Sequence, residues 1–302
     1  MIFVRNVSLA VAVCGLVCSC QSFKKQSANT NDVYIANQAD RDYSRLKPKR
    51  KYKNYTESML QGIKPILWNS DEGMKMLRET GYSMPFFELA HHFAIQQYPN
   101  SCNLATMRLI LSAIYENTGT QFLLDKQHSF LKEYNGTDNG RFVLTEENIM
   151  ELYKGKDENK DYLVLTRQKP RKNGEYDGGI LPKDLADLFN LHPHVKAKAY
   201  AVKPEELSKE RINEFRNLVK DITLNKNKYL AVNYHLGIMY PITSGHYSTV
   251  VAYHPGKDMV LIMDVAGHLG TWAWVDLEDL YRSMNTVISG FDRGYIVIEQ
   301  TK

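Results

Sequence analysis

Apolar side chains recur at helical spacing in three stretches of the chain. These stretches are residues 103–119, 181–192 and 209–223. In the first, NLATMRLILSAIYENTG, apolar residues three and four positions apart predict one buried face, and Gly119 marks the end. We therefore expect three amphipathic helices in these stretches.

The last third of the chain changes from helical spacing to strand-like runs. Strands are predicted at residues 228–234, 246–254, 257–266 and 293–300, with a further helix at 276–285. Pro255 and Gly256 separate the second strand from the third, which predicts a β-hairpin. Helices followed by an antiparallel sheet indicate the α+β class.

The N-terminus has a pattern of its own. A short apolar run, VSLAVAVCGLV at residues 7–17, is followed by small residues before Cys20. The run is too short to cross a bilayer comfortably, and with Cys20 it resembles the signal of a bacterial lipoprotein; an uncleaved apolar N-terminus is the alternative. We expect a signal peptide at residues 1–19 and a lipid on Cys20 that anchors the protein in the bacterial envelope. Gln21 favours the outer membrane, with the protein facing the periplasm.

A polar basic linker is predicted at residues 20–55, ahead of a catalytic domain at 56–302. Its densest part, RLKPKRKYKNY at residues 45–55, is either a solvated tether or a contact for anionic lipid head groups. The whole chain has 302 residues, 43% of them hydrophobic and 24% charged, with a net charge of +4. This is an ordinary globular composition, and the charge is too mild to indicate a nucleic-acid partner.

Cysteine is sparse, with residues only at positions 14, 18, 20 and 102. Signal cleavage would remove the first two and a lipid would block the third, so Cys102 would remain without a disulfide partner in an oxidising compartment. Such a cysteine is either an inert core residue or a nucleophile. Cys102 stands where a predicted helix begins, and unpaired N–H groups there favour a thiolate, so we favour the nucleophile.

A cysteine nucleophile needs a base, and His246 is the best placed of the nine histidines. Folding of the predicted hairpin brings His246 near Asp264 or Val265 on the neighbouring strand. A histidine held by a carboxylate is the arrangement of a catalytic triad. Gln96 precedes Cys102 closely and could form an oxyanion hole together with the Cys102 N–H group.

The other histidines do not indicate a metal site. His91 and His92 could be ordinary surface or packing residues, and His192 and His194 lie near a helix end around a proline. None of them has the spacing or the cysteine neighbours typical of metal ligands. We therefore predict no metal site and no required cofactor.

The motifs resemble those of the phytochelatin synthases, which are papain-like cysteine peptidases that act on glutathione. The segment QYPNSCNLA at residues 97–105, which follows Gln96, is similar to the family's nucleophile motif. The segment GHYSTVVAYHPGKDMVLIMDVA at residues 245–266 is similar to its histidine and aspartate hairpin. The similarity covers about residues 82–298.

The resemblance implies a papain-like α+β fold, with an N-terminal helical part packed on an antiparallel sheet. It also implies that Cys102, His246 and Asp264 are catalytic and that Gln96 supplies the oxyanion hole. These are the four residues that the motif analysis selects. The sequence does not contain the cysteine-rich C-terminal region of the plant members, as in the short bacterial forms.

The sequence departs from the family pattern at three positions near the motifs. The family glycine after the nucleophile is Asn103, and two family arginines are replaced by Leu236 and Gly267. Because a guanidinium is a good partner for a substrate carboxylate, their absence leaves the γ-glutamyl specificity open. The residues that could compensate are His235, His268 and Arg293.

We expect a thiol hydrolase or γ-glutamylcysteine transferase that cleaves the Cys–Gly bond of glutathione through a thioester on Cys102. Hydrolysis is expected to exceed phytochelatin synthesis, as in short bacterial members. Metal–glutathione complexes are possible substrates. Two alternatives are a papain-like peptidase acting on another short peptide and a non-catalytic lipoprotein that binds thiol ligands.

Overall fold

The computed structural model describes residues 65–97, 101–119, 144–146, 149, 169–170, 176–177, 180–240, 244–267, 269–288 and 291–302. The predicted signal peptide at 1–19, Cys20 and the linker at 20–55 lie outside these residues. The predicted domain start at residue 56 also lies outside them. Among the described helices, none is both long enough and apolar enough to cross a membrane.

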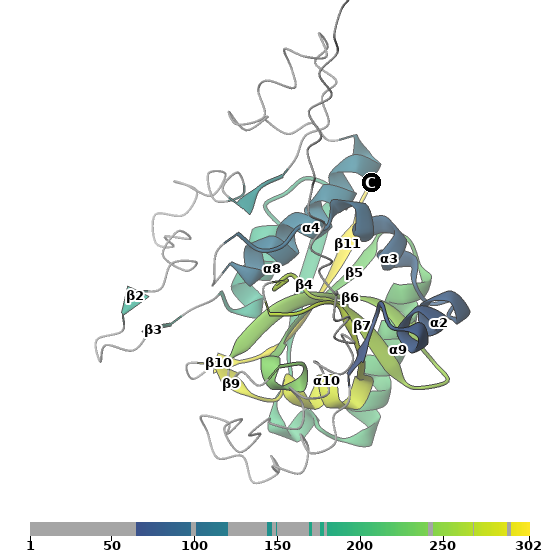
Figure 1. Cartoon of the computed structure of the whole chain (residues 1–302). Coiled ribbons are helices and arrows are strands. Elements are labelled where there is room, and N and C mark those ends of the chain that lie inside the picture. The colour runs from purple at the N-terminus through teal and green to yellow at the C-terminus, as the bar shows by residue number, and fades with distance from the viewer. Residues whose placement is uncertain are drawn as a thin grey trace, which may run out of the picture.

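A seven-stranded sheet forms the centre of the described part (Figure 1). Its spatial order is β1 (Ile66–Leu67), β8 (Ala273–Asp276), β7 (Met259–Met263), β6 (Gly245–His254), β5 (Lys228–His235), β11 (Gly294–Gln300) and β4 (Val195–Ala201). All neighbouring strands in this sheet are antiparallel. Two short two-stranded pairs complete the described strands: β9 (Val287–Ile288) with β10 (Phe291–Asp292), and β2 (Lys169–Pro170) with β3 (Tyr176–Asp177).

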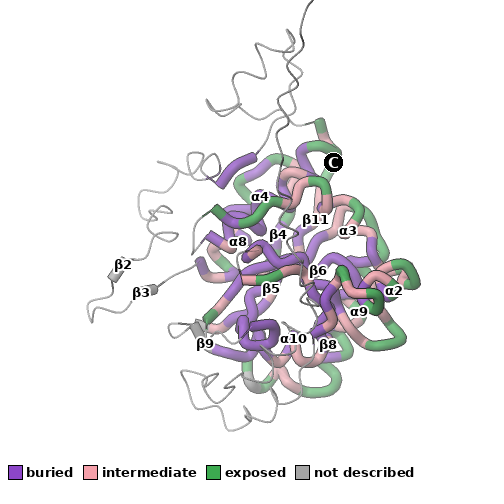
Figure 2. The backbone as a smooth tube through the Cα atoms, in the orientation of Figure 1, coloured by how far each residue is buried: buried purple, intermediate pink, exposed green. Residues whose placement is uncertain are grey.

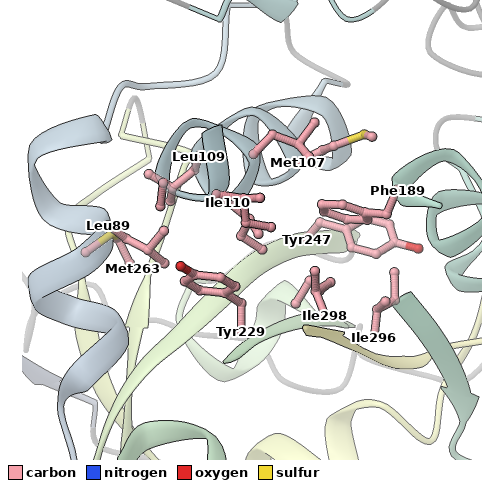
Figure 3. Close-up of a cluster of buried hydrophobic side chains, with 14 of the residues drawn as sticks. Leu89, Met107, Leu109, Ile110, Phe189, Tyr229, Tyr247, Met263, Ile296 and Ile298 are labelled. Atoms are coloured by element: carbon pink, nitrogen blue, oxygen red, sulfur yellow. The ribbon is translucent and has the colours of Figure 1, made fainter. Parts of the chain in front are cut away.

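One group of helices packs on the sheet around α4 (Cys102–Thr118). The others are α2 (Asp71–Glu79), α3 (Met84–Leu89), the 3-10 helix η3 (Ala90–His92) and α8 (Pro182–Phe189). Figure 3 shows Met107, Leu109 and Ile110 of α4 above Tyr229 and Tyr247 of the sheet. Each of these five side chains is at most 1% exposed, so burial of apolar surface fixes α4 on the sheet.

A second buried cluster joins other strand residues to α9 (Lys209–Leu224) and α10 (Leu277–Ser283). Ser208 caps α9, since its hydroxyl oxygen accepts a hydrogen bond from the N–H of Arg211. Phe215 and Val219 of α9 are buried in this cluster, while the outer side of the helix is exposed (Figure 2). The sheet is therefore covered by helices on both faces. Two short 3-10 helices, η5 (Pro204–Glu206) and η6 (Leu236–Ile238), connect these elements.

The helices around residues 103–119, 181–192, 209–223 and 276–285 are confirmed, with ends that differ by one to three residues. Three of the four predicted strands match closely, whereas β7 ends at Met263 rather than at residue 266. The simple order of helices followed by a sheet is wrong, because β1 and β4 precede the last helices and join the sheet. The α+β class is confirmed, and the papain-like arrangement remains a prediction.

Candidate active site

Cys102 is the first residue of α4, as the apolar pattern predicted. The thiol is free and half-buried. Ser101 stands at the N-cap position, but its side chain makes no capping hydrogen bond. The N–H groups in the first turn of a helix have no partner within the helix, so this end of α4 favours negative charge beside Cys102.

A β-bulge shifts the register of the hairpin that carries the predicted base. On the side of the hairpin tip, Ala252 of β6 pairs with Leu261 of β7. On the other side, Thr249 pairs with Met263. Between these two pairs, β6 has three residue steps and β7 has two, so β6 contains one extra residue. This extra residue changes which β7 side chain lies opposite each β6 side chain.

This shift brings Asp264 to the same face as His246. Continuing the pairing by one residue places Asp264 opposite Ser248, and His246 and Ser248 share a face because strand side chains alternate. Without the extra residue, Asp264 would lie opposite Thr249 and point to the other face. The same register places Ala266 opposite His246, so His246 reaches Asp264 diagonally rather than directly across the pair.

His246 lies between Asp264 and Cys102. Its Nε2 atom is 2.6 Å from Oδ1 of Asp264, and both side chains are almost fully buried. Cys102 lies close enough to His246 for its charge to raise the pKa of the imidazole, and Nδ1 is the ring nitrogen that does not contact Asp264. The structure therefore brings together the three residues that the sequence selected, in the order cysteine, histidine, aspartate.

The carboxylate of Asp264 is held by further donors. Tyr240 donates its hydroxyl proton to Oδ2 at 2.7 Å. Ser248 donates to Oδ1 at 3.1 Å, and the backbone N–H of Ala266 donates to the same oxygen at 2.9 Å. A buried carboxylate needs such partners to remain ionised, and they also fix its orientation toward His246.

These contacts govern the protonation of the pair. Burial disfavours the charged form of His246, but the charges of Asp264 and Cys102 and the hydrogen bonds to both raise its pKa to about 10. Burial acts to raise the pKa of Asp264, but His246 and the donors from Tyr240 and Ala266 lower it below its ordinary value. His246 is therefore protonated and Asp264 ionised at neutral pH.

Gln96 lies at the end of the sheet where Asp264 is found. Its backbone N–H donates to the carbonyl oxygen of Val265 at 2.9 Å, and its side chain is 7% exposed. Before it in the chain, the carbonyl oxygen of Ala94 accepts a hydrogen bond from Arg108 of α4. The segment that carries Gln96 is therefore fixed to both α4 and the hairpin.

Residues 171–295 match the sequence model of the phytochelatin synthase family. This range contains the hairpin with His246 and Asp264. This part of the chain is similar to the phytochelatin synthases.

Curated relatives extend this similarity toward the N-terminus. The chain is 26% identical to glutathione gamma-glutamylcysteinyltransferase 3 of Lotus japonicus, over 77% of this chain and 42% of the relative. It is 24% identical to glutathione gamma-glutamylcysteinyltransferase 1 of Arabidopsis thaliana, over 78% of this chain and 42% of the relative. It is 26% identical to the glutathione gamma-glutamylcysteinyltransferase of Schizosaccharomyces pombe, over 76% of this chain and 46% of the relative.

The chain thus spans less than half the length of these curated relatives. A match that covers 76% of 302 residues cannot begin later than about residue 73. Each of the three matches therefore includes Gln96 and Cys102 as well as the first part of residues 171–295.

Two positions where the chain departs from the phytochelatin synthase pattern are apolar in the structure. Leu236 is 4% exposed and lies in the hydrophobic cluster with α9. At Gly267, a side chain would begin 2.6 Å from an atom of Ile95, so Ile95 occupies that space. Neither position offers a cation to a substrate.

Of the three residues that could compensate, Arg293 is the buried cation. Burial and the charge of Arg293 lower the pKa of His235 to about 3, so His235 is neutral at physiological pH. Its Nδ1 atom accepts a hydrogen bond from the N–H of Gly237 at 3.0 Å. The Arg293 guanidinium packs on Gly245, the residue before His246, and its Nε donates to Thr286 at 2.6 Å. His268 lies outside the described residues.

Sequence reasoning missed two residues that hold Asp264 beside His246. Ser248 could have been found, because it is two positions after His246 and must share its face. Tyr240 gave no such signal, because it follows the 3-10 helix η6 and approaches Asp264 only in the folded chain.

The Tyr240 hydroxyl is expected to support Asp264, so Tyr240→Phe should lower kcat about 10-fold, the effect of losing one hydrogen bond to a charged group. Removing this donor raises the pKa of Asp264, because the bond favours the ionised form. The acid limb of the pH–rate profile should therefore move to higher pH. Glycine release from glutathione across pH measures both effects.

Tyr281→Phe is the matched control, since that hydroxyl donates to the carbonyl oxygen of Glu206 instead. It should leave the rate and the acid limb unchanged. A Tyr240→Phe profile that superimposes on the parent profile would show that Tyr240 does not position Asp264.

Proposed function

We propose that this protein is an enzyme that cleaves the Cys–Gly bond of glutathione through a thioester on Cys102, with hydrolysis favoured over transfer to a second glutathione. The observation that carries this proposal is the placement of His246 beside Cys102 and within hydrogen-bond distance of the buried carboxylate of Asp264. The names of the curated relatives support glutathione as the donor and γ-glutamylcysteine as the transferred group.

The first step forms the thioester. Because His246 is protonated at neutral pH, the proposed scheme starts from a thiolate–imidazolium pair. The sulfur of Cys102 attacks the carbonyl carbon of the cysteine residue in glutathione. The carbonyl oxygen becomes an oxyanion, for which the Cys102 N–H at the start of α4 and the Gln96 side chain are the proposed donors. The C–N bond then breaks, and the glycine nitrogen leaves with the proton from His246.

The second step releases the product. His246, now neutral, takes a proton from water as the water oxygen attacks the thioester carbonyl carbon. Breaking the C–S bond frees γ-glutamylcysteine and leaves the thiolate of Cys102 beside protonated His246, as at the start. Asp264 remains ionised throughout and stabilises the imidazolium each time it forms. No cofactor takes part in this scheme.

Arg293 is the proposed partner for a substrate carboxylate. It is a buried cation packed against the first residue of β6, the strand that carries His246. A guanidinium forms bidentate hydrogen bonds with a carboxylate, and glutathione carries two carboxylates. One such cation is enough to orient the donor molecule for the first step.

Transfer to a second glutathione has a further requirement. The acceptor must place its free amine at the thioester, so a second anionic peptide has to be bound. Leu236 and Gly267 offer no charge for this purpose, and water needs no such site. We therefore favour hydrolysis, and metal–glutathione complexes remain possible forms of the substrate.

Incubation of the protein with glutathione should yield glycine and γ-glutamylcysteine in equal amounts, with little longer polymer even at high glutathione. Chromatography with mass detection measures all three products, and Cys102→Ala serves as the inactive control. Mass analysis of the protein should show an acyl adduct of γ-glutamylcysteine on Cys102. Efficient polymer formation would contradict the preference for hydrolysis.

The apolar character of Leu236 and Gly267 favours a second candidate, a cysteine peptidase that acts on another short peptide. In that case glutathione would release no glycine, while a panel of short peptides would include a substrate whose turnover depends on Cys102. The same product analysis therefore distinguishes the two candidates.

A further inference from the structure

Two histidines and a glutamate meet at the end of α4 opposite Cys102. His91 and His92 are the last two residues of η3, and Glu116 lies in the last turn of α4. The Nε2 atom of His91 is 2.6 Å from Oε2 of Glu116, and that of His92 is 2.9 Å from the same oxygen. All three candidate ligand atoms lie within 4.8 Å of one another.

The two imidazole rings also lie against each other. Their centroids are 3.8 Å apart and their planes differ by 40°. In a tetrahedral zinc site, bonds of about 2.0–2.1 Å place ligand atoms roughly 3.4 Å apart. The rings and the carboxylate would therefore have to separate by less than 1 Å to admit a cation, which exposed side chains can do.

The chemistry of the three groups narrows the choice of ion. Imidazole suits zinc, copper and nickel better than magnesium or calcium, and a carboxylate oxygen is a common third zinc ligand. His91 and Glu116 are about half-exposed, with side-chain exposures of 51% and 44%, so solvent reaches the cluster. Water can complete the coordination.

We propose that His91, His92 and Glu116 bind a divalent cation of the zinc type, in a site separate from the catalytic residues. Glu116 follows Cys102 by fourteen positions on the same helix, or about 21 Å at 1.5 Å per residue. Each histidine would bind through Nε2, the ring atom that now lies in contact with Oε2 of Glu116.

A cation here would fasten the segment that leads to the active site. After η3 ends at His92, the chain runs beside α4 toward Gln96. On the way, Arg108 of α4 donates a hydrogen bond to the carbonyl oxygen of Ala94. The start of this segment, at His91 and His92, would then be joined to Glu116 of α4 by metal–ligand bonds as well as by the present polar contacts. Ligand pairs that are distant in sequence close a loop in this way.

Sequence analysis predicted no metal site because the glutamate is distant from the two histidines in the sequence. His91 and Glu116 are 25 residues apart, a separation that matches no ligand motif. The site depends on η3 packing against the C-terminal end of α4, which only the fold shows.

The test uses the full chain with its cysteines alkylated by iodoacetamide, so that Cys102 and the other thiols cannot bind the metal. Titration calorimetry with Zn²⁺ should show one ion per chain. Glu116→Gln should weaken binding at least about 10-fold, since it removes a ligand yet keeps an acceptor for the histidine N–H groups. Saturating Zn²⁺ should raise the Tm by several degrees in the parent and not in this variant.

His91→Ala, at an exposed position, tests a second ligand and should weaken Zn²⁺ binding similarly. His194→Asn is the matched control, because asparagine tolerates the positive φ of 61° found there; it should bind Zn²⁺ as the parent does. Equal affinity in the parent and Glu116→Gln, or no Zn²⁺ binding by the parent, would overturn the proposal. Neither result would bear on glutathione cleavage, which is measured separately.

Discussion

Replacing His246 by alanine is expected to reduce glycine release from glutathione by about 10⁴-fold or more, as loss of a triad member does in other nucleophilic enzymes. In the proposed scheme, His246 is the residue that gives a proton to the leaving glycine nitrogen. Cys102→Ala should be equally inactive. The measurement is kcat/KM for glycine release, with the fold checked by circular dichroism.

His254→Ala is the matched control, because it removes a half-buried histidine from the other end of β6. It should keep most of the activity. If His246→Ala retained more than about a hundredth of the parental rate, a base other than His246 would have to serve Cys102.

Asp264→Asn should lose less activity than His246→Ala. His246, Ser248 and the N–H of Ala266 all contact Oδ1, and an asparagine oxygen can take that place. Among the described residues, only the Tyr240 hydroxyl is hydrogen-bonded to Oδ2, and it can rotate to accept a hydrogen bond from the new amide. The variant therefore keeps the orientation of His246 and loses the charge that stabilises the imidazolium. Activity as low as that of His246→Ala would show that this charge is indispensable.

Gln96→Ala is expected to lower kcat by about 10²-fold or more, with a smaller effect on KM. An oxyanion donor acts mainly on the transition state, because the carbonyl oxygen becomes charged only after the sulfur attacks. The side chain is buried beside the end of β7, where solvent would not replace it with equal orientation. Steady-state kinetics with glutathione measure the change.

Gln97→Ala is the control for this variant. It removes the neighbouring, exposed amide, and the backbone N–H of residue 97 keeps its bond to Glu146 at 2.9 Å. Gln97→Ala should leave kcat within a few-fold of the parent. An equal loss in both variants would indicate that the segment was displaced rather than that Gln96 stabilises the oxyanion.

The sequence predicted the positions of Cys102 and His246 because both depend on local periodicity. An apolar face at residues 103–119 fixes where α4 begins, and a proline–glycine pair fixes the hairpin. The contact between them depends on α4 packing across the sheet, which no local pattern describes. The family resemblance supplied that contact in advance.

Strand β4 shows why the sheet was incompletely predicted. Its sequence, VKAKAYA, is rich in lysine and alanine, which have low strand propensity. Seven residues nevertheless pair in register with β11, so tertiary pairing outweighs local preference. An edge strand with charged side chains also resists pairing with other molecules.

The bulge in β6 has a consequence for how this hairpin can evolve. Substitutions along β6 and β7 do not change the pairing register of the two strands, so the hairpin should accept many changes of side chain. An insertion or deletion of one residue between Val250 and His246 would turn His246 away from Asp264 while leaving a well-paired sheet. The loop at residues 255–258, beyond the bulge, is under no such constraint. Natural length variation should therefore concentrate at that tip, and the base of the hairpin should vary in sequence but not in length.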